Sequence, residues 1–198
     1  MRRWALFGGS FDPVHYGHLA LAELLRELED LDRVLFVPAR RSPHKGSTAA
    51  APRHRLAMLR LAVRGNPRLG VSDLELGRRG PSYTIDTVRT LAARWQQRPT
   101  LLLGGDALLD LPTWRESAAL LGEARIVVFA RPGAESARSR ARALGLPYHD
   151  VALVPTSSSM LRALLRRGLS IRYQVPEPVR RYIERHRLYR RPHRRRRP

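Results

Sequence analysis

Two histidines close to a pair of glycines stand near the start of the chain and are suited to phosphate chemistry. Tyr16 and Gly17 separate His15 from His18, and the glycine pair occupies positions 8–9. Side chains three residues apart on a helix share a face, so both imidazoles can meet one ligand if a helix begins near Tyr16. A helix amino terminus favours anions, and imidazoles there can donate hydrogen bonds to phosphate oxygens in a transition state. The spacing therefore predicts a phosphate site.

Other interpretations of this segment are weaker. A zinc pair would need a third ligand arranged nearby, and none is found. Two ordinary surface histidines would not require the glycines before them and the helix after them. The glycine pair is followed neither by the third glycine of a dinucleotide fingerprint nor by the Gly-Lys-Ser/Thr of a Walker loop. We expect Gly8 and Gly9 to let backbone N–H groups approach phosphates closely.

The elements that must position these residues alternate between strand and helix. We expect strands at 4–7, 34–37, 69–72, 100–103, 125–130 and 148–154, and helices at 19–31, from Pro52, at 82–95, and from about 158 and 177. Continuous apolar strands separated by helices indicate a parallel sheet covered on both faces. The predicted fold is α/β, a Rossmann-like doubly wound parallel sheet with a small C-terminal helical extension.

Ligands of such a sheet bind beyond the carboxyl ends of its strands. Five polar or glycine-containing segments follow predicted strands: 8–9, 38–45, 104–106, Arg131 and 156–159. We expect all five to line one edge of the sheet.

Two of the loops leave alternatives open. His44 and Lys45 form a cationic loop that suits an anion site equally as well as a solvated surface, and Lys45 is the only lysine in the chain. Ser82 is a plausible N-cap, and the free N–H groups of Tyr83 and Thr84 behind it can bind a carboxylate or simply begin a helix.

Three further positions have both a binding and a structural interpretation. Asp106 follows a strand and can accept ribose hydroxyls, whereas Trp114 can stack on a flat ring or fill the core. The serine cluster at 156–159 can bind phosphates at a helix start or only cap the helix. Arg162 can point back to the same phosphates.

Composition limits the classes of protein that fit. The chain has 198 residues, 43% of them hydrophobic, which suits one α/β domain with a real core. The absence of cysteine excludes disulfides and Cys-ligated zinc. No apolar run is long enough for a signal peptide or a membrane span, so we expect a cytoplasmic protein with no membrane partner.

The net charge is +20, which favours a polyanionic partner such as nucleic acid. Nearly all of this charge is arginine, however, which indicates a coding bias spread over solvated faces. Residues 190–198 hold six arginines without apolar anchors, and we expect a disordered tail there. The predicted organisation is a catalytic domain at 1–189 and a polybasic tail at 190–198, with no specific nucleic-acid partner.

The run from Gly8 to His18 resembles the (His/Thr)-x-Gly-His signature of the nucleotidyl transferase superfamily. The resemblance extends to about Tyr189 and is greatest to the bacterial nicotinate-mononucleotide adenylyltransferases. It implies transfer of AMP from ATP to nicotinate mononucleotide, which yields deamido-NAD and pyrophosphate in NAD biosynthesis, with Mg²⁺ as cofactor. It leaves open whether the chain forms a homo-oligomer.

The resemblance also implies residue roles. It gives catalytic roles to His15, His18 and Arg162, and no metal ligands from the protein. It implies ATP binding by Gly8, Gly9, Ser10, Phe11, Gly104, Asp106, Arg131, Ser157 and Ser158. It implies binding of nicotinate mononucleotide by His44, Lys45, Tyr83, Thr84 and Trp114.

The sequence departs from the family pattern at three of these places. Ser42 replaces the first proline of a Pro-Pro-His-Lys element, and Thr156 and Ser159 replace the isoleucine and threonine of Ile-Ser-Ser-Thr-x-x-Arg.

Two rival functions remain open for this sequence. One is a sister transferase acting on pantetheine phosphate or glycerol phosphate, and the other is a non-catalytic nucleic-acid-binding protein.

Overall fold

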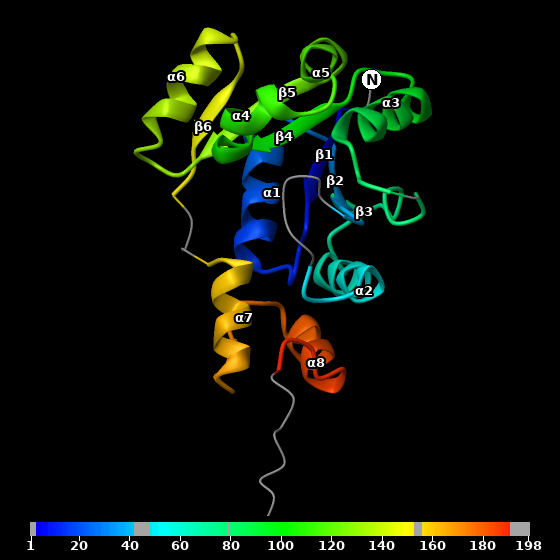
Figure 1. Ribbon diagram of the computed structural model, residues 1–198, viewed down its shortest axis with the longest axis vertical. Helices are drawn as coiled ribbons and strands as arrows, with labels where there is room; N and C mark the ends of the chain where they lie inside the picture. Colours follow the sequence, from blue (N-terminus) through cyan, green and yellow to red (C-terminus); the bar gives the residue numbers. More distant parts are fainter. Residues whose placement is uncertain (1–2, 42–47, 79, 153–155, 191–198) are drawn as a thin grey trace, which may run out of the picture.

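A six-stranded parallel sheet forms the centre of the protein, with helices on both faces (Figure 1). The structure is a computed structural model that describes residues 3–41, 48–78, 80–152 and 156–190. The strands are β1 (Trp4–Gly9), β2 (Arg33–Pro38), β3 (Leu69–Val71), β4 (Thr100–Gly104), β5 (Arg125–Ala130) and β6 (Tyr148–Asp150). Their order, β3-β2-β1-β4-β5-β6, is that of the Rossmann fold, which confirms the predicted class.

Helices connect successive strands of the sheet, and two more helices follow the last strand. They are α1 (Tyr16–Leu28), α2 (Pro52–Ala62), α3 (Thr84–Trp95), α4 (Gly105–Asp110), a 3₁₀ turn η1 (Leu111–Thr113), α5 (Ser117–Glu123), α6 (Glu135–Ala143), α7 (Ser158–Arg166) and α8 (Glu177–Arg185). In Figure 1, α7 and α8 lie together below the sheet, beside α2. None of the helices in the described ranges has the length and hydropathy needed to cross a membrane.

Alternating side chains of the strands form two separate cores, one on each face of the sheet. Phe7 of β1 and Leu102 of β4 pack with α1, α2, α7 and α8. Their neighbours Leu6 and Leu103 point the other way and pack with α3, α4 and α5. A strand with apolar residues on both faces needs cover on both faces, which is the physical reason for the continuous apolar runs in the sequence.

The expected elements agree with the observed ones in kind and differ at some ends. The helix expected to begin at Ser82 begins at Thr84, with Tyr83 as its N-cap, so the expectation that Ser82 caps it was wrong. The Ser82 hydroxyl instead accepts a hydrogen bond from the backbone N–H of Arg40 at 3.0 Å. The last strand ends at Asp150, and positions 153–154 of the predicted strand lie outside the described residues.

Candidate active site

A cavity of about 860 Å³ lies at the carboxyl ends of the strands, between β1 and β4 and their following loops. The change of winding direction between these two strands creates a crevice there in every sheet of this order. Most of the predicted site residues line it: Gly8, Gly9, Ser10, Phe11, His15, His18, Tyr83, Thr84, Gly104, Asp106, Trp114, Arg131, Ser158 and Arg162. Ser157 is not among the described lining residues, and His44 and Lys45 lie outside the described ranges.

The turn after β1 brings the backbone close to the cavity. Phe11 adopts a left-handed conformation with φ of 49° and buries its ring, leaving 2% of it exposed. A Cβ at position 9 would lie 2.9 Å from that ring, so only glycine fits beneath it. Gly9 therefore serves the packing of Phe11, whereas a Cβ at Gly8 would meet no atom within 4 Å.

The two histidines face each other at the start of α1. Their ring centroids are 3.7 Å apart, and the backbone N–H of His15 donates to Nδ1 of His18 at 3.3 Å. A Cβ at Gly17 would lie 3.0 Å from Nδ1 of His15, which explains the glycine between them. The predicted shared face at a helix amino terminus is thus present.

Burial sets the charge of His15. Only 5% of the residue is exposed, and loss of hydration lowers the pKa of its imidazole to about 4. His15 is therefore neutral at pH 7 and carries one ring N–H that it can donate. A bound polyphosphate would raise this pKa, because it adds negative charge beside the ring.

The start of α7 lines the cavity next to the turn after β1. Ser157 caps the helix by accepting the backbone N–H of Met160 at 3.2 Å, and Ser158 donates to the carbonyl of Pro13 at 2.9 Å. Arg162 donates to the carbonyl of Asp12 at 2.7 Å and thus holds its guanidinium beside the turn after β1. The start of α7 and the turn after β1, which lie far apart in the sequence, therefore meet at the cavity.

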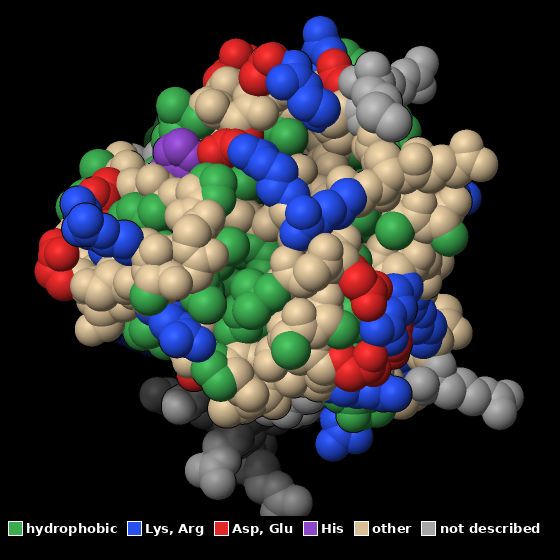
Figure 2. Space-filling model, turned by 90° about the horizontal axis from the view of Figure 1, so that it is seen from above, with side chains coloured by type: hydrophobic (Ala, Val, Ile, Leu, Met, Phe, Trp, Pro, Cys, Tyr) green, Lys and Arg blue, Asp and Glu red, His purple; other side chains and the backbone are tan. Residues whose placement is uncertain are grey.

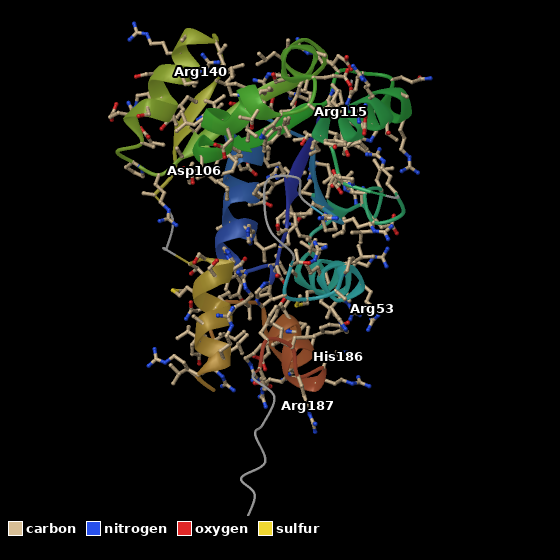
Figure 3. All side chains as sticks on the ribbon, viewed as in Figure 1. Arg53, Asp106, Arg115, Arg140, His186 and Arg187 are labelled. Atoms are coloured by element: carbon tan, nitrogen blue, oxygen red, sulfur yellow. The ribbon has the colours of Figure 1, made fainter. Side chains whose placement is uncertain are left out.

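The pair Gly104-Gly105 has a packing role that the sequence analysis did not separate from binding. A Cβ at Gly105 would lie 2.9 Å from the Cβ atoms of both Ala130 and Ala137. Glycine there lets α4 lie close to β5 and α6, which places Asp106 on the cavity. Figure 3 shows Asp106 on α4, and Arg131 lines the same cavity from the end of β5.

Tyr83 and Trp114 form an aromatic part of the cavity wall. Both rings are half-buried and line the cavity, as do Thr84 and Arg115. The guanidinium of Arg115 lies 4.8 Å from the centre of the Tyr83 ring, in cation–π contact. A cationic, aromatic wall of this kind suits a flat anionic ring (Arg115 is labelled in Figure 3).

A buried carboxyl group supports this wall from below. Glu75 is 6% exposed, accepts a hydrogen bond from the hydroxyl of Thr87 at 2.8 Å, and lines the cavity. Burial raises the pKa of Glu75, with the hydrogen bonds of Thr87 and Ser82 opposing that rise. Glu75 therefore fixes the turn that leads into α3.

Two residues that sequence analysis missed, Arg55 and Tyr189, hold the loops that follow β1 and β2. Arg55 is fully buried and donates to the carbonyls of Ser10 at 2.8 Å and Ala39 at 2.7 Å. The carboxylate of Asp12 accepts a hydrogen bond from the hydroxyl of Tyr189 at 2.7 Å. Neither signal is local, because one arginine among many and a tyrosine near the chain end carry no motif.

Basic and acidic side chains are mixed on the part of the surface that Figure 2 shows. The arginines are also spread over opposite ends of the structure, with Arg140 on α6 and Arg53 and Arg187 near α2 and α8 (Figure 3). Many are paired within the described chain, as Arg89 is with Glu123 at 2.8 Å.

Comparison with known proteins identifies the class to which this fold and cavity belong. A model of the cytidylyltransferase-like family matches residues 6–164, and the chain belongs to that family.

The relatives are more specific than the class. A probable nicotinate-nucleotide adenylyltransferase of Symbiobacterium thermophilum is 44% identical over 96% of each chain. Another from Thermus thermophilus is 45% identical over 95% of this chain and all of its own. The fold matches that of the Plasmodium falciparum nicotinic acid mononucleotide adenylyltransferase complexed with NaAD, with a TM-score of 0.76, 21% identity, and coverage of 96% and 98%.

Proposed function

We propose that this protein is a nicotinate-nucleotide adenylyltransferase, which transfers AMP from ATP to nicotinate mononucleotide and releases pyrophosphate. The observation that carries this proposal is one cavity that joins the histidine pair of α1 to the aromatic wall of Tyr83 and Trp114. Two relatives that are 44% and 45% identical over 96% and 95% of this chain are named probable nicotinate-nucleotide adenylyltransferases, which supports the proposal.

The reaction is an in-line displacement in which the protein positions the reactants and stabilises charge. A phosphate oxygen of nicotinate mononucleotide attacks the α-phosphorus of ATP, and the bond to the bridging oxygen of pyrophosphate breaks. His15 and His18 donate hydrogen bonds to triphosphate oxygens as negative charge develops there. Ser158 and Arg162 bind the β- and γ-phosphates from the start of α7. No side chain needs to form a covalent intermediate.

Magnesium enters this scheme with the nucleotide. The described residues contain no group of three histidines or carboxylates that could hold a metal ion. In the proposed scheme the phosphate oxygens of ATP would hold the ion, which would supply additional charge neutralisation of the leaving group.

The remaining contacts divide between the two substrates. We assign the backbone at Gly8 to Phe11 and the side chains of Asp106 and Arg131 to ATP, together with Gly104 and Ser157. Tyr83, Thr84 and Trp114 bind the pyridine carboxylate and ring, and His44 and Lys45 bind the acceptor phosphate. We also propose that the catalytic domain extends to residue 189, and the hydrogen bond from Tyr189 to Asp12 supports this boundary.

An acceptor panel tests the proposal. Purified protein is incubated with ATP, Mg²⁺ and one of four acceptors: nicotinate mononucleotide, nicotinamide mononucleotide, pantetheine phosphate or glycerol phosphate. Pyrophosphate release should be fastest with nicotinate mononucleotide. Turnover confined to pantetheine phosphate or glycerol phosphate would make the protein a sister transferase.

A further inference from the structure

Tyr189, near the C-terminus, returns to the part of the cavity that we assign to ATP. Tyr189 follows α8 and packs against the core beneath the sheet, 177 residues after the carboxylate that its hydroxyl contacts. Burial, and next to it the carboxylate of Asp12, raises the pKa of the Tyr189 hydroxyl. The phenol therefore stays protonated and donates its hydrogen bond throughout the neutral pH range.

Asp12 is the point at which several segments meet. Its Oδ2 accepts the backbone N–H of Ala49 at 2.7 Å, and its Oδ1 accepts that of Ala50 at 3.1 Å. Its carbonyl accepts the guanidinium of Arg162 at 2.7 Å. With 4% exposure, this carboxylate has little access to water that could replace a lost partner.

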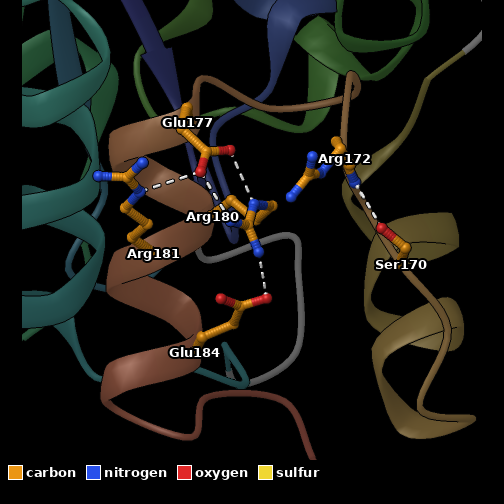
Figure 4. A network of polar contacts seen from close by, with 6 residues as sticks. All are labelled: Ser170, Arg172, Glu177, Arg180, Arg181 and Glu184. Atoms are coloured by element: carbon orange, nitrogen blue, oxygen red, sulfur yellow. Dashed lines mark hydrogen bonds and ion pairs between the residues drawn. The ribbon is translucent and has the colours of Figure 1, made fainter.

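The hydroxyl that completes this set comes from a firmly held segment. Arg180 on α8 is paired with Glu177 at 2.6 Å and with Glu184 at 2.5 Å, as Figure 4 shows. The hydroxyl of Tyr182, also on α8, lies 3.0 Å from Nδ1 of His54 on α2. Val179 and Ile183 of α8 also pack in the same core as Tyr189, and this packing holds the segment before Tyr189 without the hydroxyl of Tyr182.

We propose that Tyr189 is a positioning residue of the adenylyl-transfer site, acting through Asp12 on Arg162 and on the turn after β1. This proposal rests on the proposed function. Without the Tyr189 hydroxyl, the Asp12 carboxylate can turn away from the N–H groups of Ala49 and Ala50, next to cavity-lining Thr48. The turn after β1 then loses the contacts that hold it in place, and the backbone carbonyl of Asp12, which accepts a hydrogen bond from Arg162, can shift with that turn. Small displacements at a reacting centre are costly: about 1 Å can lower the rate about 10²-fold.

The chain offers a matched pair of variants to test this. Tyr189→Phe and Tyr182→Phe each remove one phenol hydroxyl from the C-terminal segment, and each hydroxyl has one hydrogen-bond partner in another segment. We expect similar small decreases in Tm. Only Tyr189→Phe should lower kcat, by about tenfold or more, with a smaller change in the KM for ATP. Equal kcat in the two variants, at the wild-type value or below it, would overturn the proposal.

A binding measurement separates this inference from the proposed function. Titration with a non-hydrolysable ATP analogue should show a Kd about fivefold higher for Tyr189→Phe than for Tyr182→Phe, as expected for one hydrogen bond. If the wild-type protein fails to adenylate nicotinate mononucleotide, the proposed function fails, but this titration still decides the role of Tyr189. Identical Kd values would then reject it.

A double variant tests the route through Asp12. Asp12→Asn keeps the size of the side chain but weakens its acceptors. If Tyr189 acts through Asp12, then Asp12→Asn combined with Tyr189→Phe should lower kcat no further than the more damaging single variant. Losses that multiply would show that the two residues act independently, contrary to the proposal.

Discussion

We call the part of the cavity that we assign to ATP the donor half, and the part that we assign to nicotinate mononucleotide the acceptor half. The two halves differ in how firmly their residues are held. In the donor half, Phe11, Asp12 and His15 are 2%, 4% and 5% exposed, and Arg162 donates a hydrogen bond to the backbone carbonyl of Asp12 at 2.7 Å. Around the acceptor ring, Tyr83 is half-buried and Arg115 is exposed. Catalysis by charge stabilisation requires fixed donors, whereas selection of an acceptor tolerates a more open wall. Changes in the donor half should therefore affect kcat, and changes in the acceptor half should affect KM.

The largest effect is expected in the donor half, from His18→Ala. Loss of a hydrogen-bond donor to the transition state should lower kcat by about 10²-fold or more. Steady-state kinetics with ATP varied at saturating nicotinate mononucleotide measures it. His186→Ala, on an exposed residue outside the cavity, is the control. A variant with normal kcat and only a raised KM for ATP would remove His18 from the catalytic residues.

Arg55→Met should lower the stability of the protein, because it removes hydrogen bonds to loops beside the donor half. The substitution leaves the part-buried carbonyls of Ser10 and Ala39 without their hydrogen-bond donor, at a cost of about 1–3 kcal/mol for each unsatisfied group. We expect the free energy of unfolding to fall by about 2–5 kcal/mol in urea titrations. For Arg60→Met, on the same helix and with a 60% exposed side chain, the free energy of unfolding should fall by less than about 1 kcal/mol. Equal losses would show that the burial of Arg55 contributes nothing.

Trp114→Ala should act only on the acceptor. Stacking of a ring on an aromatic side chain contributes about 1–3 kcal/mol, so the KM for nicotinate mononucleotide should rise about tenfold while that for ATP stays constant. Trp95, which packs edge-on against Trp4 with centroids 5.3 Å apart, serves for comparison. A parallel rise in both KM values would place Trp114 in the core rather than in the binding wall.

Acid should destabilise the donor half through His15. The pKa of His15 falls from 6.5 to about 4 on folding, so the unfolded chain binds more protons between these values. The stability that this difference contributes is complete above pH 6.5 and is lost as the pH falls toward 4, by up to about 1.4 kcal/mol per pH unit. His15→Gln should flatten this part of the stability profile. An unchanged slope would mean that His15 is not buried as the structure shows.

The smallest effect is expected from ending the chain at Arg190. Because Tyr189 is retained, kcat and both KM values should stay within about twofold of wild type, as for surface changes worth less than about 0.5 kcal/mol. Tight, sequence-selective nucleic-acid binding by the shortened protein would favour a binding protein over an enzyme.

Local patterns correctly predicted the fold and the shared face of His15 and His18. The apolar runs of β1, β4 and β5 are continuous because both faces are covered, and the histidine pair lies where its spacing places it. The N-cap at Ser82 was wrong because its hydroxyl bonds to Arg40, a partner that only the folded chain supplies. Asp12 and Tyr189 meet across 177 residues, and no local pattern records that contact.

The most direct test of the account is a competition between two acceptors in one reaction. Equal concentrations of nicotinate mononucleotide and nicotinamide mononucleotide are supplied with ATP and Mg²⁺, and the two dinucleotide products are separated and counted at early times. The acid dinucleotide should dominate, because the N–H groups at the start of α3 and the cation of Arg115 favour a carboxylate over an amide. Equal amounts of both products, or an excess of the amide, would contradict the proposed acceptor site.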